Sequence, residues 1–336
     1  MKQSSQSLLF ECPPSETDGR IDTSSTFVGN MSLPVHRWFR FSAGFSAAWA
    51  ESVIDAARLS GETRVLDPFC GSGTTLLAAE NIGVESVGIE AHPFLSRIAR
   101  AKLLRRTDAS DFLSLACRVR ELAQTLKASI NHYPQLIRKC YPAESLQRLD
   151  RLRRALVQLR DESDAWTLVW LSLAAILRPC SPVGTAQWQY VLPKKEKKRV
   201  VDPFDGFDSM IRLMARDMRT CEHVNGPPAS LIQGDARTCT DVSDSFATLV
   251  VTSPPYPNNY DYADATRLEM CFFGEVAGWG DLQGKVRSGL IRSCSQHVPE
   301  KAVNLRFVLA ADELLPIRDE ITEICEQLAK VRLMKG

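Results

Sequence analysis

Residues 64–90 read RVLDPFCGSGTTLLAAENIGVESVGIE, and this stretch decides the fold. It opens with a short apolar run over 64–67, which predicts a strand, and passes through a glycine-rich turn into helix-forming residues from Thr74 to Asn81. A second apolar run over 86–90 predicts another strand that ends on Glu90. A strand, a helix and a second strand within about 30 residues form a β-α-β unit, the usual opening of a parallel sheet.

The sequence around this unit predicts one doubly wound α/β domain that is interrupted by helices. Residues 43–59 carry apolar side chains at spacings of three and four, as a helix does. The pattern from 93 to 178 is almost entirely helical, and another helix is expected over 208–219. Strands resume at 231–233 and 247–252, so the helical stretch falls between the second and third strands of the sheet.

Four segments follow from this pattern. We expect a flexible N-terminal arm rich in Ser, Thr and Pro, a first part of the α/β domain, a mainly helical insertion, and a second part of the α/β domain. Their predicted boundaries are 1–30, 31–100, 101–228 and 229–336.

Composition limits the kind of protein. The 336 residues are 44% hydrophobic and 24% charged, which is typical of a soluble globular chain. A net charge of +1 provides no global positive field, so a nucleic-acid partner must be held by local basic patches. Ten cysteines without a CxxC pair and five histidines without metal spacing predict neither a metal site nor disulfides. The longest apolar run, 165–177, is too short to span a bilayer, so we expect a cytoplasmic protein without a membrane partner.

The turn between the first strand and its helix has the features of a ligand-binding loop. Gly71 and Gly73 permit positive φ, and the helix start exposes unpaired N–H groups, so the turn can cradle a nucleotide-like ligand. No Gly-Lys-Ser/Thr follows, which excludes a phosphate-binding P-loop, and Leu76 stands where a dinucleotide motif needs a third small residue. Glu90 is placed to accept both hydroxyls of a ribose, although a plain tight turn remains the alternative.

The residues DPFCGSGTT at 67–75 closely resemble DPFxGxGTT, the cofactor motif of amino-group DNA methyltransferases, and GIE at 88–90 fits the ribose-binding position of that family. The resemblance implies a Rossmann-like class I methyltransferase sheet with S-adenosylmethionine as the cofactor. Glu90 is implied to bind the ribose and Asp235 to accept from the adenine amino group. The full set of implied cofactor-binding residues is Asp67, Phe69, Gly71, Gly73, Thr74, Glu90 and Asp235. The upstream residues 36–39 and Phe45 resemble the segment that packs over the methionine moiety.

A second motif, Ser253-Pro254-Pro255-Tyr256, follows the predicted strand at 247–252. The carboxyl end of such a strand is where open α/β sheets bind ligands. An exocyclic amine is a poor nucleophile because its lone pair is delocalised into the ring. The Ser253 hydroxyl and the Pro254 carbonyl are candidates to accept its hydrogens and return electron density to nitrogen. The adjacent Pro255 stiffens the loop, and Tyr256 offers a flat face for an extruded base. These four residues are the predicted catalytic residues of a direct displacement at the sulfonium methyl group.

SPPY resembles the motif of cytosine-N4 methyltransferases, so the implied target is cytosine N4 in double-stranded DNA, in a restriction-modification or epigenetic role. Adenine-N6 enzymes usually carry DPPY, as do several RNA methyltransferases. Ser and Asp have related roles at position 253, so adenine N6 is the first alternative target. An RNA base is the second alternative. A cognate restriction endonuclease is a possible partner.

Basic residues concentrate in two places. A charge run is usually a solvated face, but an enzyme that acts on DNA needs phosphate contacts. The loop cluster Lys194, Lys195, Lys197, Lys198 and Arg199 is the first candidate for these contacts, together with Asn258 in the polar and aromatic continuation of SPPY at 257–262. The second cluster lies in a helical run and comprises Arg97, Arg100, Lys102, Arg105 and Arg106.

The resemblance thins beyond Tyr262. Complete sheets of this class close with three more strands, whereas 304–310 offers one short strand at most and 311–336 predicts a helix. We therefore expect a C-terminally incomplete domain. The corresponding alternative function is a cofactor- or DNA-binding remnant that a second polypeptide completes.

Overall fold

A computed structural model describes residues 27–183, 197, 199–256, 260–293 and 308–335. The described residues up to 293 belong to one compact unit and residues 308–335 belong to another, so the two are treated separately.

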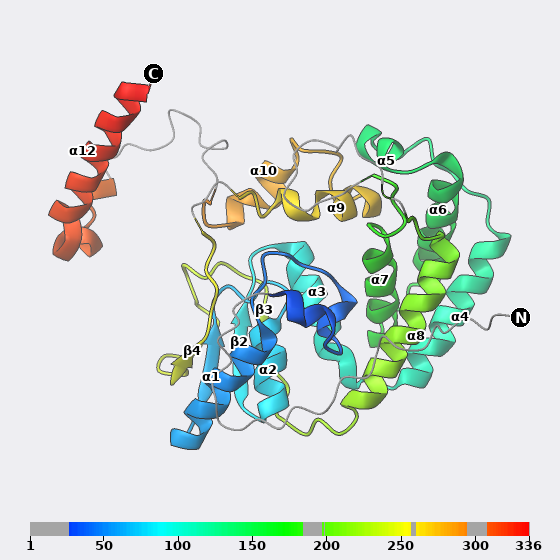
Figure 1. Cartoon of the computed structure of the whole chain (residues 1–336), viewed down its shortest axis with the longest axis horizontal. Coiled ribbons are helices and arrows are strands. Elements are labelled where there is room, and N and C mark those ends of the chain that lie inside the picture. Colours follow the sequence, from blue (N-terminus) through cyan, green and yellow to red (C-terminus); the bar gives the residue numbers. More distant parts are fainter. Residues whose placement is uncertain (1–26, 184–196, 198, 257–259, 294–307, 336) are drawn as a thin grey trace, which may run out of the picture. The chain divides into compact units, whose positions relative to one another are not determined.

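The first unit is built on a four-stranded parallel sheet (Figure 1). Its strands are β1 (Arg64–Asp67), β2 (Glu85–Ile89), β3 (Ser230–Ile232) and β4 (Leu249–Val250), in the order β3-β2-β1-β4. This sheet and its helices confirm the predicted α/β class. Because β1 lies between β2 and β4, the loops that follow these three strands emerge side by side at one edge of the sheet.

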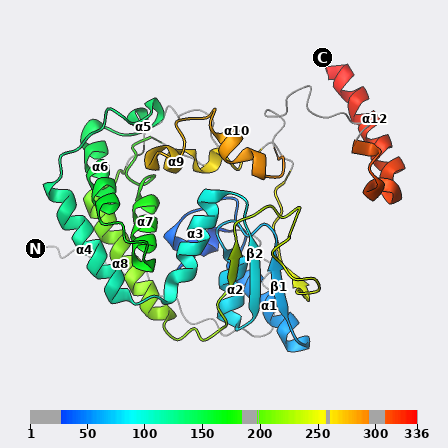
Figure 2. The same cartoon turned by 180° about the vertical axis from the view of Figure 1, so that it is seen from behind.

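Two helices, α1 (Ala47–Ser60) and α2 (Thr74–Ile82), pack against each other on one face of the sheet (Figure 2). Val65 of β1 is buried there in a cluster with Ala50 and Ala78, so apolar contact fixes the two helices to the central strand. Leu66, the next residue along β1, is only partly buried, and Val250 of β4 is 56% exposed.

The remaining helices between β2 and β3 form a second layer beside the sheet. Helix α3 (Pro93–Leu103) is followed by η3 (Leu104–Arg106), and in both views α3 lies between the sheet and this layer (Figures 1 and 2). Phe94 of α3 meets Trp170 edge to face, with ring centroids 5.3 Å apart. The layer contains α4 (Ala109–Thr125), α5 (Gln135–Cys140), α6 (Ala143–Gln158), α7 (Asp164–Ile176) and α8 (Pro203–Cys221).

Most of the basic run at 97–106 is internal, which corrects its interpretation as a solvated or DNA-facing surface; of its five cations, Arg100 alone is exposed. Arg105 and Arg106 each lie 3.0 Å from the buried carboxylate of Glu80 on α2. The Arg97 guanidinium stands 3.7 Å from the centroid of a Trp170 ring, and Lys102 is buried. These cations therefore connect α2, α3 and the helical layer to one another.

After β4 the chain crosses back toward the helical layer. This segment contains η4 (Asp264–Thr266), α9 (Arg267–Phe273), α10 (Leu282–Lys285) and η5 (Arg287–Gly289). The buried Glu269 of α9 pairs with Arg178, which follows α7, at 2.6 Å. The pair fixes the segment to the helical layer.

The predicted flexible arm covers residues 1–30, but its last four residues are helical. Residues 27–31 form η1 (Phe27–Met31), which is followed by η2 (His36–Trp38). The buried Asn30 holds η1 in place, because its side chain donates to the Phe45 carbonyl at 2.8 Å and accepts from the Ala47 N–H at 2.9 Å. The remainder of the predicted arm, 1–26, lies outside the described residues.

The second unit is helical in its described part. It comprises η7 (Asp312–Ile317) and α12 (Arg318–Lys335), which agrees with the helix expected over 311–336. Of the possible strand at 304–310, residues 304–307 lie outside the described part, and Val308 and Leu309 are helical. Across the described residues of both units, no helix has the length and apolar character needed to cross a membrane.

Candidate functional site

An open cleft of about 780 Å³, its mouth included, lies at the carboxyl edge of the sheet. Its walls come from the loops after β1, β2, β3 and β4, together with residues 41–45 and 289–291. Four loops from a parallel sheet therefore converge on one site, as the fold class leads one to expect.

The turn after β1 forms one wall of the cleft. Gly71 and Gly73 have φ of 54° and 85°, a left-handed conformation that disfavours any side chain. A Cβ on Gly73 would also lie 3.3 Å from the Cβ of Ala99 on α3. The predicted cofactor residues Phe69, Gly71 and Thr74 line the cleft, whereas Gly73 shapes the turn without lining it.

Asp67 is fully buried beneath this turn and does not line the cleft. One carboxylate oxygen accepts from the Thr75 hydroxyl at 2.5 Å, and the other accepts from the Phe69 N–H at 3.0 Å and the Thr252 hydroxyl at 2.8 Å. Burial raises the pKa of Asp67, and the hydrogen bonds from Thr75, Thr252 and Phe69 oppose that shift. The carboxylate thus ties the turn after β1 to the start of α2 and to the end of β4. In this structure Asp67 positions the turn, and its assignment to the cofactor stays a prediction.

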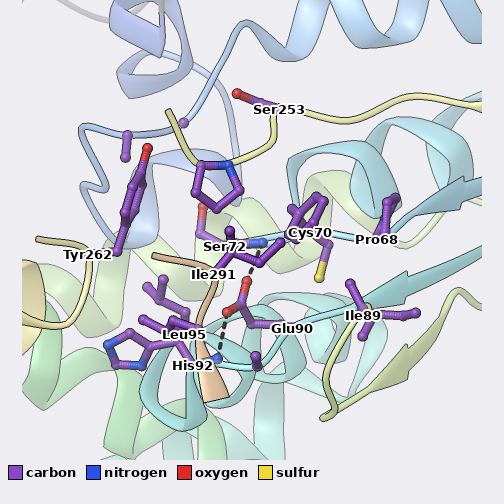
Figure 3. Close-up of a pocket in the computed structure, with 18 of the residues that line it drawn as sticks. Pro68, Cys70, Ser72, Ile89, Glu90, His92, Leu95, Ser253, Tyr262 and Ile291 are labelled. Atoms are coloured by element: carbon purple, nitrogen blue, oxygen red, sulfur yellow. Dashed lines mark hydrogen bonds between the residues drawn. The ribbon is translucent and has the colours of Figure 1, made fainter. Parts of the chain in front are cut away.

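Glu90 lies at the end of β2 and is 8% exposed. One carboxylate oxygen accepts from the Gly71 N–H and the other from the His92 N–H, each at 2.7 Å (Figure 3). Burial raises the pKa of Glu90 to about 7, and these two backbone bonds act in the opposite direction. The carboxylate has no cationic partner among the described residues, and it faces the cleft with lone pairs free to accept hydroxyl protons.

His92 was not singled out from the sequence, although it also lines the cleft. Its Nδ1 accepts from the Phe94 N–H at 3.2 Å and caps α3, so the proton of the neutral ring sits on Nε2. That nitrogen lies 2.9 Å from the Thr266 hydroxyl. Burial lowers the pKa of His92 to about 4, so the neutral ring connects the end of β2 to η4. A helix-capping residue directly before Pro93 was the signal available in the sequence.

Asp235 lines the cleft from the loop after β3. Its carboxylate is held by the Arg237 guanidinium, with Nη2 at 2.5 Å and Nε at 2.9 Å, and by the Arg237 N–H at 2.9 Å. These bonds lower the pKa of Asp235. A ligand amino group at this position has to share the carboxylate with Arg237.

The four predicted catalytic residues leave the end of β4 as one loop. Ser253 and Pro255 line the cleft, whereas Pro254 does not and Tyr256 is 59% exposed. In Figure 3, Ser253 lies at the top of the drawn site, and Glu90 lies below it, nearer to His92. The hydroxyl and the carboxylate therefore occupy different parts of the cleft.

Tyr262 orients the loop after β4. It lines the cleft, and its hydroxyl accepts from the Tyr256 N–H at 3.2 Å. Beside it, the buried Asp261 pairs with Arg287 at 2.6 Å, which brings residues 289–291 to the wall of the cleft (Figure 3). The sequence placed 257–262 near a base pocket but provided no sign of the Asp261–Arg287 pair.

The upstream aromatic segment divides into two parts. Phe41 and Phe45 line the cleft. In the expected covering segment at 36–39, Arg37 and Trp38 instead bond the buried Asp217 of α8, at 2.5 Å and 2.9 Å. Those two residues anchor the segment to the helical layer and do not cover the cleft.

The predicted phosphate contacts are only partly described. Lys194, Lys195, Lys198 and Asn258 lie outside the described residues. Arg199 is exposed. Lys197 donates from Nζ to the Arg178 carbonyl at 2.6 Å, and partial burial lowers its pKa. One of the three N–H donors of Lys197 is thus used inside the protein, and its role as a phosphate contact stays a prediction.

Comparison with known proteins identifies relatives of this arrangement. Residues 15–101 match the model of a family described as DNA methylase, a range that includes the turn after β1 and Glu90. The chain is 25% identical over 279 residues to the type II methyltransferase M.BsoBI of Geobacillus stearothermophilus. It is also 25% identical over 273 residues to the type II methyltransferase M.AvaI of Nostoc sp.. Each match covers 74% of this chain, which spans 54% and 56% of the length of these curated relatives. No solved structure matches the chain significantly.

Proposed function

We propose that this chain, which belongs to the amino-group DNA methyltransferase family, transfers a methyl group from S-adenosylmethionine to the exocyclic N4 amine of cytosine in double-stranded DNA. The observation that carries the proposal is the junction at Asp67. One buried carboxylate binds the Phe69 N–H in the turn after β1, Thr75 at the start of α2, and Thr252, the neighbour of Ser253. The loop with the family's cofactor motif and the loop with SPPY are thus fastened together on one cleft.

The residues of the cleft suit a nucleoside cofactor. Glu90 presents a carboxylate that two N–H groups already orient, and a carboxylate without a cation is suited to the two hydroxyls of a ribose. Asp235 at the neighbouring strand end is the candidate acceptor for the adenine amino group. Phe69, Ile89 and Leu290 add apolar surface for the rings. When bound, S-adenosylmethionine supplies an electrophilic methyl group on a sulfonium.

The loop after β4 is the candidate site for the target amine. The Ser253 hydroxyl and the Pro254 carbonyl are assigned to accept the two amine hydrogens, which holds the nitrogen lone pair toward the cleft. Tyr256 presents an exposed ring to a base that has left the duplex stack. Two consecutive prolines and the bond from the Tyr256 N–H to Tyr262 restrict this loop before the base arrives.

Cytosine N4 is favoured over adenine N6 because position 253 carries Ser where adenine enzymes of this family usually carry Asp. The relatives' designation as type II methyltransferases motivates a restriction-modification role, in which a restriction endonuclease accompanies the methyltransferase.

Transfer of a tritiated methyl group tests the class of substrate. The purified chain is incubated with labelled S-adenosylmethionine and either mixed-sequence duplex DNA or RNA. We expect label in duplex DNA, its loss in Ser253→Ala, and its retention in Ser209→Ala, a control at an exposed serine of α8. Label in RNA alone contradicts the proposal.

A further inference from the structure

We infer that Trp279, on the turn between α9 and α10, stacks on DNA bases beside the extruded base, and that Arg292 contacts a phosphate of the same duplex; this inference rests on the proposed function. Trp279 is 43% exposed, although tryptophan is highly buried on average in proteins. It stands between Gly278 and Gly280, and a Cβ on either glycine would meet no atom of the described residues within 4 Å. The turn therefore presents the indole ring to solvent.

Contacts with Arg287 fix the position of Trp279. The Arg287 guanidinium lies over the Trp279 ring, 4.4 Å from its centroid. Asp261 holds that guanidinium, because one carboxylate oxygen accepts from Nη2 at 2.6 Å and from Nε at 3.2 Å. The Trp279 carbonyl accepts from Nη1 of Arg287 at 3.5 Å and from the Leu282 N–H at 3.3 Å. The ring is thus oriented before a ligand arrives, which lowers the entropy cost of stacking on it.

The same contacts join Trp279 to the rim of the cleft. Asp261 directly precedes Tyr262, which lines the cleft, and Arg287 lies two residues before the lining residues 289–291. Two wall segments of the cleft are therefore fastened to each other by the ion pair that supports the Trp279 ring. A duplex that delivers a base into the cleft has to pass over this rim.

An indole ring suits the part of the duplex from which a base has left. Extrusion removes a stacking partner from each of the two neighbouring bases. A flat aromatic side chain can stack on either of them, whatever their identity, because every base has a π face. Apolar side chains that insert between base steps also stabilise a distorted duplex. Trp279 would therefore favour the extruded state without reading sequence.

Arg292 supplies a positive charge on the same rim. It is exposed, and none of the ion pairs among the described residues includes it. The neighbouring Ser293 hydroxyl donates to the Tyr260 carbonyl at 2.6 Å, which ties this part of the chain to the segment that carries Asp261. An exposed guanidinium on a fixed backbone is suited to a phosphate oxygen.

The salt dependence of methyl transfer separates stacking from phosphate contact. For the full chain, kcat/KM for mixed-sequence duplex DNA is measured by tritium transfer at several salt concentrations. Isothermal titration calorimetry with S-adenosylhomocysteine reports the fold and the cofactor site of each variant. The variants are Trp279→Ala, Trp279→Phe and Arg292→Met. The control is Leu59→Ala, an exposed apolar residue of α1 that lies close before β1, at the edge of the sheet opposite the cleft.

We expect Trp279→Ala to lower kcat/KM by about 5- to 150-fold at every salt concentration, the range for one lost base stack. Trp279→Phe should stay within about threefold of the wild type, because a smaller ring still stacks. Arg292→Met should lower kcat/KM and make the slope of log(kcat/KM) against log[salt] shallower by about one, whereas Trp279→Ala should leave this slope unchanged. Leu59→Ala should change neither quantity, and all variants should bind S-adenosylhomocysteine as the wild type does.

Three results overturn the stacking contact: an unchanged kcat/KM in Trp279→Ala, an equal loss in Trp279→Phe, or weakened S-adenosylhomocysteine binding in either variant. An unchanged salt slope in Arg292→Met overturns the phosphate contact. In each case the proposed function stands, because the wild type still methylates duplex DNA. A wild-type chain that transfers no label to duplex DNA overturns the proposed function and this inference together.

Discussion

Substitution of Glu90 by Gln probes the ribose end of the cleft. Each carboxylate oxygen of Glu90 accepts one backbone N–H at 2.7 Å. An amide keeps only one acceptor oxygen, so its NH₂ group faces a backbone N–H and one bond is lost. A ribose hydroxyl that donated to the charge then meets a neutral group. Hydrogen bonds to charged groups contribute about 1.5–3 kcal/mol, so we expect S-adenosylhomocysteine to bind Glu90→Gln about 10- to 100-fold more weakly.

The raised pKa of Glu90 adds a pH signature. With a pKa of about 7, the wild-type carboxylate is mostly ionised at pH 8 and mostly protonated at pH 6. Cofactor affinity should therefore fall as the pH drops through 7, by up to about tenfold per pH unit below the pKa. Glu90→Gln should lack this component. Calorimetric titrations at pH 6, 7 and 8 measure both effects.

The free energy of unfolding of the unliganded chain should change with pH in the direction opposite to the cofactor affinity. The folded-state pKa of Glu90 lies above its ordinary value of 4.5, so its stabilising contribution is complete below that value and is lost as the pH rises through 7. The difference corresponds to about 3 kcal/mol between pH 4 and pH 8. A wild-type affinity that does not depend on pH, together with an unchanged affinity in Glu90→Gln, would refute this account of the ribose end.

Three further predictions concern the supports of the site. Asp67→Ala should lower the free energy of unfolding by about 2–4 kcal/mol, because it leaves buried hydroxyl and N–H donors unpaired. The control Asp55→Ala removes an exposed pair with Arg58 and should lower the free energy of unfolding by less than about 1 kcal/mol. Urea denaturation measures both variants, and equal losses would contradict the positioning role of Asp67. Glu80→Ala should cost about 3–5 kcal/mol in the same assay because the buried Arg105 loses its counter-ion, and a loss below about 1 kcal/mol would show that the pair is unimportant. Tyr262→Phe removes the acceptor of the Tyr256 N–H, so kcat for methyl transfer should fall about tenfold. The affinity for S-adenosylhomocysteine should stay constant. A fall in this affinity alone would place Tyr262 at the cofactor instead.

The sheet was predictable because its signals are local. Apolar runs bounded by turn residues predicted strands at 64–67 and 231–233, and the structure has β1 at Arg64–Asp67 and β3 at Ser230–Ile232. The glycine pattern of the turn after β1 was informative because a positive φ at Gly71 and Gly73 is a property of the backbone at those two positions.

The parts that sequence reasoning missed depend on partners far away in the chain. The basic run at 97–106 gave no sign that Arg105 meets Glu80, 25 residues earlier, so a buried network resembled a solvated face. The side chain of Asp67 turns inward because Thr252, 185 positions later, donates to it. His92 and the Asp261–Arg287 pair became visible only once η4 and η5 were placed against the ends of the strands.

The central claim is that one cleft joins cofactor and target base, and identification of the methylated base tests it most directly. Duplex DNA is incubated with the chain and S-adenosylmethionine, digested to nucleosides and analysed by mass spectrometry. The account predicts N4-methylcytosine, which is absent when Ser253→Ala replaces the wild type. N6-methyladenine would contradict the assignment of the base, and unmodified DNA from a chain that binds S-adenosylhomocysteine would contradict the claim that this cleft carries out the transfer.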